Sequence, residues 1–226
     1  MKIPFEIGNK KFLLEPYRTH QEKDILLASS FDVKDYDRIF EIIGFKYNGF
    51  LSDNEKKAIL YKYREISIGD EVDVKFKCDN CGQGGEGVLE ASNFAIPSKR
   101  NDDDVKKLDI PVHDTTLQHF VDFDVDELDI DEFEDLKDRV QDNQVTFDFI
   151  RTVKCMKCQT EKKFDLSTLD YIIEIMSDDT LMSMYKSYNF LIYFGHHTKE
   201  GVDSMYPFER SIFIGLLNKT KEDLTK

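Results

Sequence analysis

The chain has 226 residues, four cysteines and a formal net charge of −14. A chain of this length buries roughly 70% of its unfolded surface, so it can be stable without disulfides. The sequence contains no apolar run of the ~18 residues that a membrane span needs, and its first residues lack the apolar core of a secretory signal. We therefore expect a globular protein of a reducing compartment, with no membrane span.

The negative charge is concentrated between residues 101 and 142, where 16 acidic residues stand against 4 basic ones. The remainder of the chain is close to neutral. Nucleic-acid binding depends on Lys and Arg side chains that neutralise phosphates, and the sequence has no such basic surface. The charge therefore argues against a specific nucleic-acid partner and favours protein partners with basic surfaces.

Residues 1–70 are expected to form an N-terminal hairpin followed by helices. Alternating apolar residues on either side of Gly8-Asn9 predict a hairpin over residues 3–14. Helical spacing of apolar residues predicts a helix over residues 33–45. Ser52 and Glu55 form a capping box, which predicts a second helix from there to about Glu65.

Residues 71–100 and 143–166 are expected to be two copies of one unit, which consists of a strand, a Cys-x-x-Cys knuckle and a second strand. In the first copy, strand-like alternation at Val72, Val74 and Phe76 leads into Cys78-Asp79-Asn80-Cys81. A glycine-rich reversal then leads into residues 87–90. In the second copy, Val145, Phe147 and Phe149 alternate on the approach to Cys155-Met156-Lys157-Cys158, and residues 163–166 follow.

Between the two copies lies the acidic insertion, residues 101–142. Residues 121–125 alternate like a strand, and residues 131–140 resemble a short helix. The pattern as a whole predicts an α+β fold, in which helical N- and C-terminal parts surround a split, zinc-ribbon-like β unit with four cysteines.

Residues 167–226 are expected to be helical. Ser167 and Asp170 resemble a capping box, and Asp178 or Asp179 is expected to start the next helix. Gly195 is expected to end that helix in left-handed backbone. Pro207 suits the first turn of a last helix through residue 217, followed by a frayed polar end.

The two Cys-x-x-Cys pairs predict one structural zinc site built from Cys78, Cys81, Cys155 and Cys158. A two-residue gap allows both thiolates of a pair to reach one ion at ~2.3 Å, and two pairs complete a tetrahedron. Four thiolate ligands leave no coordination position for water, so Zn²⁺ would stabilise the fold and do no chemistry. Two alternatives are four unrelated buried thiols and a thioredoxin-like redox pair, which would require a βαβ context.

Other candidate motifs are weaker. Asp122, Asp124 and Asp126 imitate the first calcium ligands of an EF-hand loop, but Glu127 and Phe133 occupy the positions that need glycine and the bidentate glutamate. The pair His196-His197 follows a helix end, where capping is the simpler interpretation. The sequence contains no phosphate-binding glycine loop, nucleophile elbow or metalloprotease helix, so no catalytic residues are expected.

Three stretches give the chain a resemblance to a known family. They are Pro16-Tyr17-Arg18 with Glu22 and Leu26-Leu27, Arg64 through Asp70 ahead of the first cysteine pair, and Met205-Tyr206-Pro207-Phe208-Glu209-Arg210. In order and spacing they resemble the baseplate hub and hub-assembly proteins of T4-like bacteriophages. In the last stretch Pro207 starts a helix, and Phe208 is expected to be buried.

The resemblance implies a late phage protein of tail assembly that binds other baseplate hub proteins, either as a hub component or as a chaperone-like assembly factor. It implies no enzymatic activity. The protein would act in the host cytoplasm during assembly and could remain in the tail baseplate of the virion. The competing class is a zinc-ribbon factor associated with nucleic acid, for which the lysines near the knuckles provide only a modest basic patch.

Overall fold

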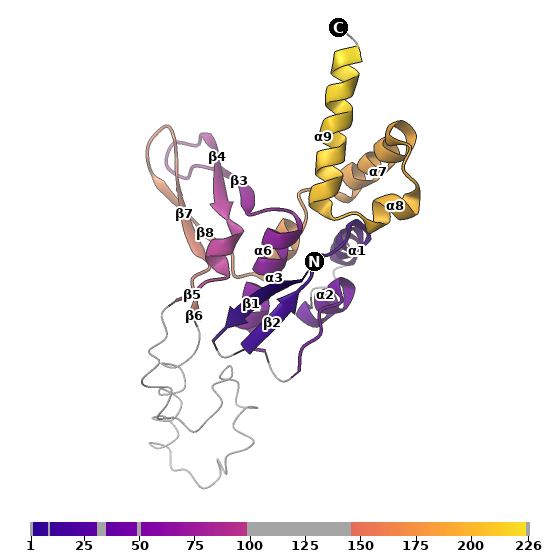
Figure 1. Ribbon diagram of the computed structural model, residues 1–226. Coiled ribbons are helices and arrows are strands. Elements are labelled where there is room, and N and C mark those ends of the chain that lie inside the picture. The colour runs from indigo at the N-terminus through magenta and orange to yellow at the C-terminus, as the bar shows by residue number, and fades with distance from the viewer. Residues whose placement is uncertain (1, 9, 31–34, 49–50, 99–145, 225–226) are drawn as a thin grey trace, which may run out of the picture.

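The computed structural model describes residues 2–8, 10–30, 35–48, 51–98 and 146–224. Within these ranges, helices and two-stranded antiparallel sheets form a mixed α+β fold, as expected. Figure 1 shows the cysteine-bearing hairpins on one side and the last three helices on the other, with helices α3 (Asp53–Ser67) and α6 (Leu169–Ile175) between them. The acidic insertion of residues 101–142, with its expected strand and helix, lies outside the described residues.

The N-terminal hairpin is confirmed. Strand β1 (Ile3–Ile7) pairs with β2 (Lys10–Leu14) in a register that runs from Ile3↔Leu14 to Ile7↔Lys10. Gly8 ends the first strand at φ 55°, in the left-handed region where glycine carries no steric cost. The buried side chains of Ile7 and Leu14 attach the hairpin to the main core.

The first helix of the structure, α1 (Thr19–Ser30), has no counterpart among the elements expected from the sequence. The next helix, α2 (Tyr36–Ile43), is shorter than the expected range of 33–45. It begins after Asp35, whose carboxylate accepts the Asp37 N–H, and it ends at Gly44 with φ 72°.

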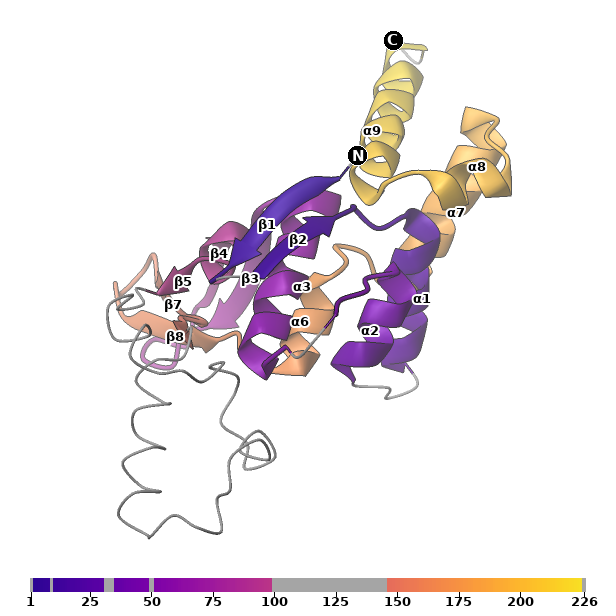
Figure 2. The same ribbon diagram turned by 60° about the horizontal axis from the view of Figure 1, so that its bottom comes forward.

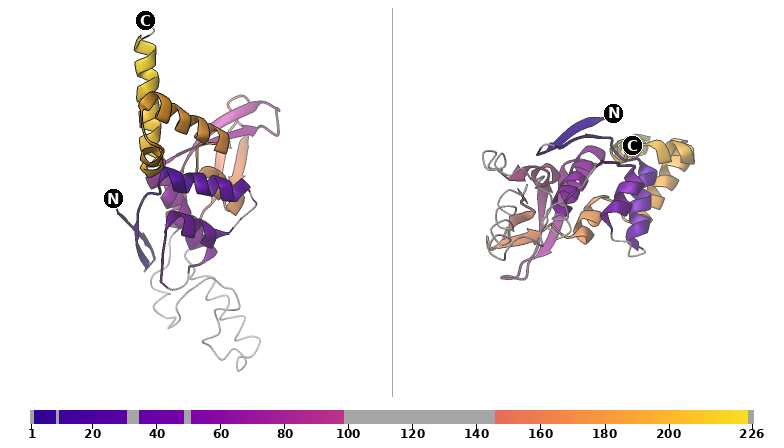
Figure 3. Two further views of the ribbon diagram at one scale, coloured as in Figure 1. Left: turned by 90° about the vertical axis from the view of Figure 1, so that its right-hand side faces the viewer. Right: turned by 90° about the horizontal axis from the view of Figure 1, so that it is seen from below.

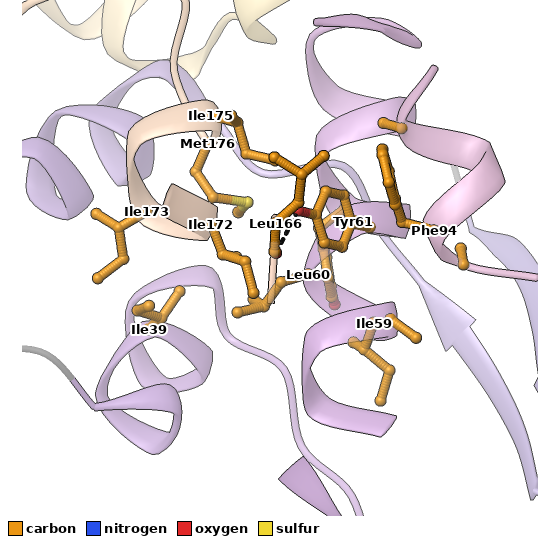
Figure 4. Close-up of a cluster of buried hydrophobic side chains, with 14 of the residues drawn as sticks. Ile39, Ile59, Leu60, Tyr61, Phe94, Leu166, Ile172, Ile173, Ile175 and Met176 are labelled. Carbon is orange, nitrogen blue, oxygen red and sulfur yellow. Dashed lines mark hydrogen bonds between the residues drawn. The ribbon is translucent and has the colours of Figure 1, made fainter. Parts of the chain in front are cut away.

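Helix α3 (Asp53–Ser67) lies at the centre of the fold, and its expected capping box is present. Ser52 Oγ accepts the Glu55 N–H at 3.1 Å, and the Glu55 carboxylate accepts the Ser52 N–H at 2.8 Å. The helix buries residues on most of its circumference, as a helix surrounded by protein must. In Figure 4 the Tyr61 hydroxyl points to the Leu166 carbonyl, to which it donates at 2.8 Å. The central helix is thereby joined to the end of the second cysteine hairpin.

Two hairpins carry the cysteine knuckles. Strand β3 (Glu71–Lys77) pairs with β4 (Gly84–Glu90), and β7 (Ile150–Lys154) pairs with β8 (Glu161–Asp165). This confirms the order strand, knuckle, strand in both copies.

The approach to the second knuckle differs from the expectation of one strand through residues 145–149. Phe147 belongs to β6 (Thr146–Phe147), which pairs with β5 (Pro97–Ser98) rather than with a knuckle strand. The chain then breaks at Asp148, whose carboxylate accepts the Ile150 N–H at 3.0 Å, and β7 starts afresh. Phe149 is buried in the core beside Tyr61, with ring centroids 5.8 Å apart.

The two cysteine hairpins pack against each other through a few apolar side chains, and the glycines of β4 leave room for them. The rings of Phe76 and Phe164 meet edge to face, with centroids 5.8 Å apart. A Cβ atom on Gly87 would lie 2.6 Å from Val153 Cγ1, and one on Gly85 would lie 2.7 Å from Phe76 Cζ. Gly87 therefore sets how closely the two hairpins approach, whereas Gly85 makes room for the Phe76 ring of its own hairpin.

The C-terminal helices begin at caps other than the expected ones. The cap of α6 (Leu169–Ile175) is Thr168 and not Ser167, since Thr168 Oγ1 accepts the Tyr171 N–H at 3.4 Å. The cap of α7 (Leu181–Gly195) is Thr180 and not Asp178 or Asp179.

The end of α7 also differs from the expectation. The left-handed residue is His196, at φ 55°, and Gly195 remains helical. A Cβ atom on Gly195 would lie 2.9 Å from His197 Cδ2, so the glycine makes room for that imidazole.

A short helix, α8 (Lys199–Ser204), leads into α9 (Pro207–Leu224), which Pro207 opens as expected. The helix continues seven residues beyond the expected end at 217, and no frayed end is seen before Leu224. The Lys221 ammonium lies over the Phe194 ring at 3.3 Å from its centroid, which ties the last turns of α9 to α7. Figures 1, 2 and 3 show α9 extending away from the rest of the molecule.

A buried ion cluster joins the C-terminal helices to the N-terminal part. Arg210 of α9 binds Glu22 of α1 at 2.6 Å and Asp179 at 2.6 Å, and both Arg210 and Glu22 are less than 5% exposed. Arg64 of α3, which is equally buried, binds Asp178 at 2.6 Å. The two aspartates expected to cap α7 are therefore ion-pair partners of buried arginines.

Candidate metal centre

Each cysteine pair lies in the tight turn at the tip of its hairpin, and the two turns have the same backbone hydrogen bonds. Cys78 N–H donates to Gln83 O at 2.9 Å, and Gly82 N–H donates to Cys78 O at 2.9 Å. The second turn repeats this pattern, with Cys155 bonded to Thr160 and Gln159 bonded to Cys155. The two Cys-x-x-Cys segments therefore present their sulfurs in the same local geometry.

The position after each pair requires left-handed backbone. Gly82 has φ 68° and Gln159 has φ 60°. Glycine adopts this conformation freely, whereas a residue with a side chain is strained in it by an estimated ~1–2 kcal/mol. The second knuckle keeps the geometry of the first despite this cost, which indicates that the turn itself is needed.

The four cysteine sulfurs converge. Their Sγ atoms all lie within 4.8 Å of one another, and Cys78 lies 3.5 Å from Cys158 and Cys81 3.7 Å from Cys155. A tetrahedral ion with ~2.3 Å bonds to sulfur has ~3.8 Å between its ligands. The two measured separations join cysteines of different hairpins, so one ion could bind both knuckles.

One cysteine of each pair is buried and the other is partly accessible. Cys78 and Cys155, the first of each pair, are buried, whereas Cys81 and Cys158 keep some contact with solvent. Side chains also connect the two knuckles directly, since Asn80 Nδ2 donates to Thr160 Oγ1 at 3.1 Å and Lys162 pairs with Asp79. The two turns are thus held in register by contacts outside the cysteines.

The second knuckle favours ionised sulfur. The Cys158 N–H lowers the pKa of Cys155, and the Thr160 hydroxyl and N–H lower the pKa of Cys158 to about 6. At Cys81 the Gln83 N–H also favours the thiolate, but burial and the other cysteines outweigh it and raise the pKa to about 11. Four sulfurs this close cannot all ionise unless a cation shares their charge.

The arrangement of the four sulfurs suits a closed tetrahedral site. With four protein ligands there is no position for a water or a substrate on the ion. His196 and His197, the next candidates, lie at the end of α7, where His196 is the left-handed cap and His197 packs against Phe213. Asp122, Asp124 and Asp126 lie outside the described residues.

The buried ion cluster is the polar feature that sequence reasoning missed. Phe208, expected to be buried, is half-exposed and stacks on Tyr206 with centroids 5.4 Å apart, whereas Arg210 two residues later is buried. Thr19 N–H donates to Met205 O at 2.8 Å, so the stretches around Arg18 and Tyr206 lie side by side. No sequence spacing links a buried glutamate of one helix to an arginine of a distant helix, so this ion pair could not be predicted from the sequence.

Comparison with known proteins gives one match. Residues 1–111 match the family described as T4 bacteriophage base plate protein. The match includes Cys78 and Cys81, whereas Cys155, Cys158 and the stretch through Arg210 lie beyond it. No curated protein and no solved structure is detectably similar to the chain.

Among the described residues, the structure has no helix that is both long and apolar enough to cross a membrane. The family match, together with the stretches at Arg18 and Arg64 that it contains, accounts for the resemblance noted in the sequence. Residues 1–111, just under half of the chain, are thus similar to T4 bacteriophage baseplate proteins, which supports a part in the phage tail baseplate.

Proposed function

We propose that the protein is a non-enzymatic component or chaperone-like assembly factor of the baseplate hub, and that it acts by binding other hub proteins. The family match carries this proposal, because it associates the chain with the tail baseplate. Binding would take place in the host cytoplasm while tails assemble, and the protein would be retained in the virion if its contacts outlast assembly.

Exposed apolar side chains on the C-terminal helices support a protein-binding role. Met182 and Tyr185 lie exposed on one turn of α7, and Ile212 and Leu216 lie one turn apart on α9. Large exposed apolar groups that gather on neighbouring elements are typical of surfaces that bind other proteins. Figure 1 shows that both helices are accessible at the end of the molecule away from the cysteine hairpins.

We further propose that Cys78, Cys81, Cys155 and Cys158 bind one structural Zn²⁺. The convergence of the four sulfurs and the repeated turn geometry support this assignment. The ion would hold the two hairpins together, and Phe149 and Leu166, which flank the second hairpin, contact Tyr61 of α3. Its role would thus be to stabilise the cysteine hairpins beside the central helix.

Co-expression with the phage's own hub proteins, followed by affinity capture, tests the function. We expect capture of at least one hub protein, and Tyr185→Ser or Leu216→Ser should weaken it because each removes an exposed apolar contact. Lys219→Ser is the matched control, since Lys219 is an exposed residue of the same helix α9. Circular dichroism should show that all three variants remain folded.

One outcome would overturn the proposal. The alternative is a zinc-ribbon factor that binds nucleic acid through the lysines near the knuckles. Salt-sensitive binding to DNA or RNA, with no capture of any hub protein, would favour that alternative. The net charge of −14 predicts the opposite result.

A further inference from the structure

Strand β3 has one edge that no other strand of the described residues covers. It pairs with β4 alone within the described part of the chain. A strand at the edge of a sheet presents unpaired N–H and C=O groups, which makes it a template for a further strand.

The hydrogen bonds at the two ends of the hairpin show which groups are free. Cys78 N–H donates to Gln83 O, and Ala91 N–H donates to Asp70 O, so the pairs 70/91 and 78/83 are hydrogen-bonded. Bonded and non-bonded pairs alternate along an antiparallel ladder. The even-numbered residues of β3 therefore bond to β4, and odd-numbered ones point their N–H and C=O away from it.

Arg64 occupies one end of this free edge. Its Nη2 donates to the carbonyl of Glu71 at 2.7 Å, as expected for an odd-numbered residue whose carbonyl points outward. The next odd-numbered residues, Asp73 and Lys75, have no such partner for their main-chain groups among the described residues. They offer two N–H donors and two C=O acceptors in a row.

A groove of about 490 Å³ runs along this edge. Residues 72 to 75 all line it, and since successive side chains of a strand point to opposite faces, the hollow follows the edge of β3 rather than one face. Its other wall is formed by α6, with Glu174 and Ile175, and Phe164 of β8 closes it. The groove thus has both apolar and polar side chains beside the unpaired main chain.

The charge of the groove is negative. Asp73, Glu174 and Asp178 line it, and its single cation, Lys75, pairs with Glu86 of β4 at 3.5 Å. Neither Asp73 nor Glu174 forms an ion pair with another residue that the structure describes. A positively charged side chain in the groove would meet two uncompensated carboxylates.

We propose that this groove binds an extended, basic segment of a partner protein, which adds to β3 as a third strand and places a Lys or Arg side chain beside Asp73 and Glu174. A helical segment has no free main-chain groups to pair with Asp73 and Lys75, and nucleic acid would be repelled by the carboxylates. The identity of the partner as a baseplate protein rests on the proposed function. The assignment of the groove as a peptide-binding site does not depend on that function.

The test uses the zinc-loaded, ¹⁵N-labelled full chain and a blocked peptide that alternates valine and lysine over about seven residues, the length of β3. On binding, hydrogen exchange should slow at the amides of Asp73 and Lys75 and change little at Val72 and Val74, which already bond to β4. A peptide with glutamate in place of lysine should bind at least about tenfold more weakly, because it places like charges opposite each other.

Asp73→Lys should weaken binding of the lysine peptide by about the same factor of ten. Asp24→Lys, an identical charge change on an exposed residue of α1, should not. Equal binding of both peptides, or protection that maps elsewhere than Asp73 and Lys75, would overturn the proposal. If the peptide binds but no hub protein is captured, the proposed hub role is refuted and the groove remains a peptide-binding site. If a hub protein is captured but the peptide does not bind, the groove proposal is refuted and the hub role remains.

Discussion

The close approach of the two cysteine hairpins at Gly87 gives the sharpest prediction. In Gly87→Ala the new Cβ atom would lie 2.6 Å from Val153 Cγ1 and 3.2 Å from Cγ2. Non-bonded carbon atoms rest at ~3.5–4.0 Å, so the hairpins must separate by about 1 Å or distort. Overpacking of this kind typically costs about 1–3 kcal/mol, and we expect the free energy of unfolding to fall by that amount.

The control is Gly84→Ala in the same strand, where the new Cβ atom would have no neighbour within 4 Å. Neither glycine has a positive φ, so only the available space differs. Gly84→Ala should be neutral or stabilising by up to about 1 kcal/mol, because alanine restricts the unfolded chain. Urea denaturation of the zinc-loaded proteins measures both changes.

The same substitution should loosen the metal site, because separation of the hairpins draws the two knuckles apart. Competition with a chelator should release zinc more readily from Gly87→Ala than from Gly84→Ala. Adding Val153→Ala to Gly87→Ala should restore part of the loss, since it removes both clashing methyl groups. If Gly87→Ala and Gly84→Ala unfold at the same urea concentration, the hairpins do not pack as described.

Three further predictions concern the metal and the ion cluster. Cys155→Ser should reduce bound zinc, measured by elemental analysis, from about one per chain to near zero, and unchanged zinc would show that the site is misassigned. Arg210→Ala should lower the free energy of unfolding, measured by urea denaturation, by about 3–5 kcal/mol, because it leaves the buried Glu22 carboxylate without its ion-pair partner. The control Arg38→Ala breaks an exposed ion pair and should lower it by less than about 1 kcal/mol. Similar losses in the two variants would contradict the burial of the cluster. Burial raises the pKa of the Glu22 carboxyl, although Arg210 opposes this shift. The folded state therefore binds the Glu22 proton more tightly than the unfolded state does. The free energy of unfolding should accordingly fall as pH rises above about 4.5. Glu22→Gln should flatten that slope, and parallel slopes for the two proteins would refute this.

Local signals in the sequence predicted the parts of the fold that local interactions determine. The capping box at Ser52, the turn at Gly8 and the two Cys-x-x-Cys turns are each fixed by residues within a few positions of one another. The convergence of Cys78 and Cys155 could also be anticipated, because a metal site implies contact between its ligands.

Interactions between distant segments determined what the sequence did not predict. Asp179 was expected to cap a helix, but its carboxylate forms an ion pair with the buried Arg210 of α9, and Thr180 is the cap instead. Gln159 adopts left-handed backbone because its knuckle must match the first one. Phe208 was expected to be buried at the start of the last helix, whereas Arg210 is the buried residue there and pairs with Glu22 of α1.

The separation of the cysteines along the chain has a consequence for the unfolded state. Cys81 and Cys155 are 74 residues apart, and Cys78 and Cys158 are 80 apart. A metal ion that binds such distant positions closes a long loop. By chain-entropy estimates, the lost conformational entropy raises the free energy of the unfolded chain by roughly 4 kcal/mol. Halving the loop changes that figure by only about 0.6 kcal/mol. Removal of residues 102–142, about half of the loop, should therefore leave the stabilisation by zinc almost intact.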